Sequence, residues 1–119
     1  MSQMYEPPLR CRNGSTVAIV NCVNAATKVW DRRLNNAYRA ALAGVDAGQR
    51  TPLQVAQRLW IQYRDANCRF YAAREGSLRD VEAAECMRSM TQQRACELEA
   101  TNQSGDALAV RCQGRPDPQ

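Results

Sequence analysis

The chain has 119 residues, 16 basic and 12 acidic residues, a net charge of +4 at neutral pH and no histidine. This length predicts one domain, and the lack of histidine excludes Ser-His-Asp and Cys-His catalysis and removes the commonest metal ligand. The basic residues are spread along the chain beside acidic ones, which argues against nucleic-acid binding, and no run of about 18 apolar residues predicts a membrane span.

Residues 1–14 are predicted to form an irregular N-terminal arm. Met1 to Arg10 is polar and contains two prolines, and Asn13-Gly14 is a typical turn pair. The segment also lacks the apolar core of a secretory signal. If the protein is exported, we therefore expect the printed sequence to be a mature or recombinant form.

The first helix is predicted over residues 16–43. Ser15 is a suitable cap, and apolar residues from Ile19 to Leu42 recur mostly at steps of three and four, the pattern of an amphipathic helix. The segment between Gly44 and Gly48 shows no strand pattern. It is predicted to be a connection or a fraying helix end.

The second helix is predicted over residues 52–73. Thr51 can cap its first amides, and Pro52 is tolerated at the first helical position. One row at helical spacing is predicted to face the core, with the polar Asn67 as its interruption. The row is Leu53, Ala56, Trp60, Tyr63, Asn67 and Phe70.

The third helix is predicted over residues 77–101, with Ser77 as cap and Asp80 as its capping partner. The tail over residues 102–119 is rich in glycine and proline and is predicted to be irregular, apart from one helical turn over 107–110 that returns Cys112 to the body. Strand signals are almost absent. The sequence therefore predicts an all-α fold, a three-helix antiparallel bundle over residues 15–101 with two terminal arms.

Six cysteines are scattered along the chain without a CxxC pair, which argues against a metal site. They are Cys11, Cys22, Cys68, Cys86, Cys96 and Cys112. The alternative to disulfides is six reduced cysteines packed as small apolar residues. An even number in a short chain predicts three disulfides and a secreted or periplasmic location.

Sequence alone does not select the pairing of these cysteines. Cys68 and Cys86 lie at the same end of the predicted helical hairpin, and Cys22 is a competing partner for either one. Two other pairs would each close a local loop and fasten an arm to a helix. The preferred pairing is Cys11 with Cys22, Cys68 with Cys86, and Cys96 with Cys112.

No constellation for catalysis or cofactor binding stands out. Asp31 and Asp65 are the one carboxylate pair that two helices could bring to a cleft, but each adjoins an arginine, and ion pairing explains them more simply. No glycine-rich phosphate loop is present. We therefore expect a protein without enzymatic activity, metal or cofactor.

The segment from Gln57 to Cys68 is the densest in residue types that dominate protein interfaces. On a helix, Trp60, Tyr63 and Arg64 share one face, and Asp65 can pair with Arg69 one turn later. The alternative is structural, and it is preferred for both aromatic residues: they fill the core, and Arg64 reaches a carboxylate such as Glu97 or Asp31.

A series of residues in order and at consistent spacing carries a family resemblance. It comprises Cys11, Cys22, Asp31, Leu34, Asn35, Tyr38, Gln57, Arg58, Trp60, Tyr63, Arg64, Asp65, Cys68, Cys86, Thr91, Arg94, Glu97 and Leu98. In these residues the chain resembles the lysozyme inhibitor LprI-like domain family of bacterial envelope proteins. Cys96 and Cys112 are additions to the four-cysteine pattern of that family.

The resemblance implies a secreted or periplasmic helical domain, often lipoprotein-anchored, although no lipidation cysteine stands at the start of this chain. It also implies a protein partner, namely a lysozyme, a related peptidoglycan hydrolase or, for an immunity protein, a toxin. The alternative function is a structural or scaffold domain of the envelope. A third hypothesis, cell-wall glycan binding, depends on Trp30 and Trp60 being accessible.

Charge gives a separate test of the inhibitor hypothesis. Animal lysozymes are strongly basic, and a partner would usually offer them an acidic patch, which the net charge of +4 opposes. Acidic residues nevertheless concentrate on the third helix, so a locally acidic face is left open and the charge argument weakens the inhibitor hypothesis without ending it. These acidic residues are Glu75, Asp80, Glu82, Glu85, Glu97 and Glu99.

Overall fold

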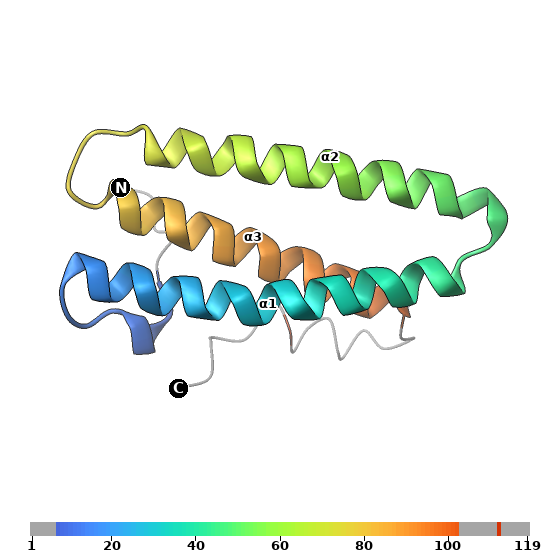
Figure 1. Ribbon diagram of the computed structural model, residues 1–119, viewed down its shortest axis with the longest axis horizontal. Coiled ribbons are helices and arrows are strands. Elements are labelled where there is room, and N and C mark those ends of the chain that lie inside the picture. Colours follow the sequence, from blue (N-terminus) through green and yellow to red (C-terminus); the bar gives the residue numbers. More distant parts are fainter. Residues whose placement is uncertain (1–6, 103–111, 113–119) are drawn as a thin grey trace.

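The structure, a computed structural model, describes residues 7–102 and Cys112. It contains a short 3-10 helix, η1 (Leu9–Cys11), and three long helices, α1 (Thr16–Gly44), α2 (Ala47–Ala72) and α3 (Arg79–Asn102). Consecutive helices are antiparallel, so α1 and α3 run in the same direction, with α3 between the other two (Figure 1). The predicted all-α class and three-helix bundle are confirmed.

The core lies mainly between α1 and α3. Leu34 and Ala37 of α1 pack with Ala95 and Leu98 of α3, and a second cluster joins Val23 to the start of α3. Alanine at these contacts lets the two helices approach closely, and each fully buried leucine contributes about 1.5–3 kcal/mol to stability. α1 and α2 make few contacts with each other, so α2 is held chiefly by α3.

The predicted start of α1 is confirmed, because Ser15 accepts a hydrogen bond from the Ala18 amide at 3.1 Å. The predicted start of α2 is wrong by five residues. Asp46 accepts from the Gln49 amide at 2.9 Å, and the Gln49 side chain accepts from the Asp46 amide at 3.4 Å. This capping box satisfies the first amides of the helix. Pro52 therefore lies inside α2, where it removes one backbone hydrogen bond near the helix start.

The start of α3 also differs from the prediction. The helix begins at Arg79, and the Glu82 amide donates to the Leu78 carbonyl oxygen at 2.9 Å. Ser77 therefore precedes the first turn instead of capping it. Gly76 has a φ of +113°, and this left-handed conformation, which glycine adopts without strain, lets the chain reverse before α3.

The capping box gives a direct test of where α2 begins. Asp46→Ala is expected to lower the free energy of unfolding by about 1 kcal/mol, because it leaves amides of the first turn without their acceptor. Thr51→Ala serves as the control and should change stability by less than about 0.5 kcal/mol. Urea unfolding of both variants measures the difference, and a larger loss for Thr51→Ala would support the later helix start.

Three disulfides brace the bundle. Cys11–Cys22 joins η1 to α1, Cys68–Cys86 joins α2 to α3, and Cys96–Cys112 joins α3 to Cys112, the one described residue beyond that helix. Each can contribute about 2–4 kcal/mol to stability. The predicted helical turn over residues 107–110 lies outside the described residues. None of the described helices is long and apolar enough to cross a membrane.

Candidate protein-binding site

The inner face of α2 differs from the predicted one. Gln57 and Cys68 are buried, and Trp60 and Arg64 are half-buried, whereas Tyr63 and Phe70 are each 62% exposed. The prediction that Tyr63 and Phe70 face the core is therefore wrong. The polar residues can occupy the inner row because they find hydrogen-bond partners on α3, which offsets the cost of burial.

Gln57 and two residues of α3 form the first of these polar contacts. The Arg94 Nε donates to the Gln57 Oε1 at 2.9 Å, and the Arg94 Nη1 donates to the Glu97 Oε1 at 2.8 Å. The Arg94 side chain is only 12% exposed, whereas that of Glu97 is 63% exposed. The pair thus places its positive charge inside and its carboxylate outside.

Arg64 forms the second polar contact. Its Nε pairs with the Asp65 carboxylate at 3.0 Å, its Nη1 donates to the hydroxyl of the fully buried Thr91 at 3.5 Å, and its guanidinium lies 5.0 Å from the centre of the Trp60 ring. The expected contact of Arg64 with Glu97 or Asp31 is therefore wrong. Asp65 pairs with Arg64, its neighbour in the chain, in place of the expected pair with Arg69.

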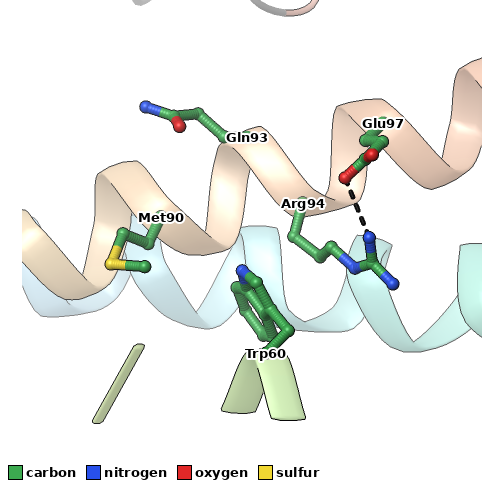
Figure 2. A pocket seen from close by; sticks show the side chains of 5 residues that line it. All are labelled: Trp60, Met90, Gln93, Arg94 and Glu97. Carbon is green, nitrogen blue, oxygen red and sulfur yellow. Dashed lines mark hydrogen bonds and ion pairs between the residues drawn. The ribbon is translucent and has the colours of Figure 1, made fainter. Parts of the chain in front are cut away.

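A groove of about 360 Å³ opens between α2 and α3. Figure 2 shows Trp60 pointing from α2 toward α3, with Met90 on one side of its ring and Arg94 on the other. Gln93 and Glu97 complete the lining. We call this cavity the Trp60 groove. It is made largely of residues that the sequence analysis had singled out, namely Trp60, Arg94 and Glu97.

A row of apolar side chains lies on the outer surface of α2. Val55, Leu59, Tyr63 and Phe70 are all exposed, and their spacing of four, four and seven residues places them on one face of the helix. We call them the outer α2 row. Large exposed apolar and aromatic residues that gather in this way mark interaction surfaces. The sequence analysis missed this row because it assigned two of its members to the core.

The remaining predicted site residues divide between the core and the surface. On α1, Leu34 is buried and Tyr38 packs against the same core cluster, whereas Asp31 and Asn35 are exposed. On α2, Arg58 is exposed. Within the described part of the chain, neither Asp31 nor Arg58 makes a hydrogen bond or ion pair. None of these residues of α1 and α2 lines the Trp60 groove.

The acidic face that the sequence left open does not form, because arginines pair with most of its carboxylates. Glu99 pairs with Arg33, Glu82 pairs with Arg74 and Glu97 pairs with Arg94. Glu85 is fully buried and paired with Arg88, and burial raises the pKa of its carboxyl group while the hydrogen bond and charge of Arg88 oppose that shift. Arginines thus neutralise four of these six carboxylates, and the other two, Glu75 and Asp80, are exposed and make no salt bridge with the described residues.

Each tryptophan has an arginine over its ring. Both are half-buried, and the guanidinium of Arg33 lies 4.4 Å from the centre of the Trp30 ring, as Arg64 does over Trp60. These arginines compete for the ring faces on which a sugar would stack. Among residues 7–102 and 112, no group of three or more metal-ligating side chains comes together.

Comparison with known proteins gives two matches. The family described as Lysozyme inhibitor LprI matches residues 11–98. An uncharacterized protein of Rhizobium meliloti is 28% identical over 117 residues, covering 85% of this chain and 84% of that protein. No solved structure matches. The family match contains the disulfides Cys11–Cys22 and Cys68–Cys86 and ends before Cys112.

Proposed function

Because this chain belongs to the LprI family of lysozyme inhibitors, we propose that it is a non-enzymatic domain that inhibits a lysozyme or a related peptidoglycan hydrolase by covering its cleft. The family match spans η1 to the last turns of α3, so it involves the whole bundle. Three disulfides fit an extracellular or periplasmic location. We place the protein in the periplasm or outside the cell, where such hydrolases act.

The outer α2 row is the observation that best supports this proposal. Leu59, Tyr63 and Phe70 are each more than half exposed, and the Trp60 groove lies beside them on the same helix. Tyrosine is one of the residue types that are enriched among the hot spots of protein interfaces, and exposed apolar side chains around it add buried area. Because Cys68–Cys86 and two long helices hold the surface in place, little ordering cost remains for binding.

The charge distribution of the bundle favours recognition through short-range contacts over attraction by a long-range electrostatic field. Since arginines neutralise four carboxylates of α3, the bundle lacks the broad acidic field that would attract a basic hydrolase from a distance. Affinity must then come from burial of the outer α2 row. The net charge of +4 weakens the approach of a basic partner without preventing this contact.

An inhibition assay tests the proposal. The protein is titrated against lysozymes of several types, and against hydrolase toxins for the immunity variant, at physiological salt. We expect inhibition at micromolar concentration or below. Leu59→Ala or Tyr63→Ala should weaken it about 30-fold, the effect of losing an interface hot spot of about 2 kcal/mol.

Leu78 provides the matched control. It is 55% exposed, close to the 57% of Leu59, but it lies in the connection before α3. Leu78→Ala should leave inhibition unchanged. The proposal is contradicted if no hydrolase is inhibited at micromolar protein, or if Leu78→Ala and Leu59→Ala have equal effects. A stable non-hydrolase partner from envelope extract, without any inhibition, would favour the scaffold function.

A further inference from the structure

We propose that the Trp60 groove receives the side chain of an arginine that the partner protein inserts between α2 and α3. This inference rests on the proposed function, because it names the partner group that the same surface recognises. It is motivated by an aromatic wall and an exposed carboxylate that share one small cavity.

The ion pair of Arg94 and Glu97 gives the groove its polarity. The Arg94 Nε donates a hydrogen bond to the Gln57 Oε1, and the Arg94 Nη1 donates to the Oε1 of Glu97. Within the described residues, the Glu97 Oε2 makes no hydrogen bond. A carboxylate can accept several hydrogen bonds, so the outward oxygen remains available to a second cation.

The lining suits the rest of an arginine side chain. Trp60 presents an aromatic surface that attracts cations, and Met90 offers a polarizable apolar contact for methylene groups (Figure 2). The guanidinium is planar and weakly hydrated, so it can lie along an indole and reach a carboxylate at once. Arg64 lies 5.0 Å from the centre of the same ring, so an inserted guanidinium must use the part of the indole that Arg64 leaves open.

The groove is large enough to hold one side chain of a partner. Its volume of about 360 Å³ is near the lower end of ligand sites, which are about 300–1,000 Å³. Arg94 nearby reduces the attraction for a second cation, although its own charge is balanced by Glu97. A free arginine derivative should therefore bind weakly, in the millimolar range, and the affinity in a complex should come from the surrounding contacts.

A titration without any partner tests the groove directly. The chain contains two tryptophans, so its NMR spectrum offers two indole N–H signals, with Trp30 as an internal control. Nα-acetyl-arginine amide should shift the Trp60 signal saturably, and the neutral citrulline analogue should not. The inference is overturned if citrulline acts equally, if Trp30 responds alike, or if the Trp60 signal does not shift.

A matched pair of charge variants tests the groove in the complex. Glu97→Gln keeps an acceptor for Arg94 but removes the charge, and it should weaken inhibition about tenfold. Glu75→Gln neutralises an exposed carboxylate outside the groove and should change inhibition less than twofold. Equal effects of the two variants would overturn the inference. If the wild type inhibits no hydrolase, the proposed function fails, but the NMR titration still tests whether the Trp60 groove binds an arginine side chain.

Discussion

Arg88→Ala is expected to lower the free energy of unfolding by about 3–5 kcal/mol at neutral pH, the cost of leaving a buried charge without its partner. Glu85 is fully buried, and the Arg88 Nε donates to its two carboxylate oxygens at 2.8 and 3.0 Å. The Arg88 Nη2 donates to the same carboxylate. Without Arg88, the buried carboxylate would keep only the more distant charge of Arg12 to balance it.

This penalty should depend on pH in a defined direction. Burial raises the pKa of Glu85, and Arg88 opposes the rise, so its removal should raise that pKa further. A carboxyl group with a raised pKa in the folded state contributes most to stability below its unfolded value of 4.5, and the contribution is lost as the pH rises through the folded value. The loss caused by Arg88→Ala should therefore be largest at neutral pH and shrink at acidic pH.

Urea unfolding at neutral and acidic pH measures both effects. Arg74→Ala is the control, because its pair with Glu82 is more exposed and should contribute at most about 1 kcal/mol. Replacing Glu85 and Arg88 together with leucine should restore much of the stability, since no unpaired charge remains. An Arg88→Ala penalty that matches the control, or that grows in acid, would contradict this account of the buried pair.

Removal of the Cys68–Cys86 disulfide is expected to have the second large effect. Cys68→Ser/Cys86→Ser should cost about 2–5 kcal/mol and loosen α2. The reason is that α2 buries few side chains against the bundle: its only buried residues are Gln57 and Cys68. Hydrogen bonds to α3 and half-buried contacts from Leu53 and Trp60 must then hold α2 alone.

Hydrogen exchange and thermal unfolding measure this effect. Amides of α2 should lose protection more than those of α1 and α3, and inhibition should fall because the Trp60 groove needs both of its walls. The control is Cys11→Ser/Cys22→Ser, which releases only η1 from α1. Equal loss of α2 protection in the two double variants would show that other contacts hold the helix.

Comparison of α1 with α2 shows how far local patterns predict this fold. Ser15 and the apolar period of α1 predict its start and extent, because capping and periodicity are local properties. The start of α2 was misplaced since Thr51-Pro52 is also a valid start signal. The capping box of Asp46 and Gln49 was equally visible in the sequence and competes successfully with it.

The inner face of α2 could not be chosen from the sequence. Two rows follow helical spacing, and the more apolar one contains Tyr63 and Phe70, which the structure exposes. The other row contains Gln57 and Arg64. It faces α3 because Arg94 and Thr91 lie opposite and satisfy its polar groups. Such partners become known only when the helices are placed side by side.

The sequence by itself determined the all-α class, the approximate extent of three helices and the resemblance to the LprI family. Helix periods and caps act over a few residues, and the order and spacing of the motif residues can be read along the chain. The tertiary structure decided which face of α2 is buried, that arginines neutralise the acids of α3, and that Trp60, Arg94 and Glu97 share one groove. The groove, the Gln57–Arg94 contact and the Arg33–Glu99 pair form between helices, so they depend on the register of α3 against its neighbours. The Glu85–Arg88 and Arg94–Glu97 pairs instead form within α3 once its side chains are placed.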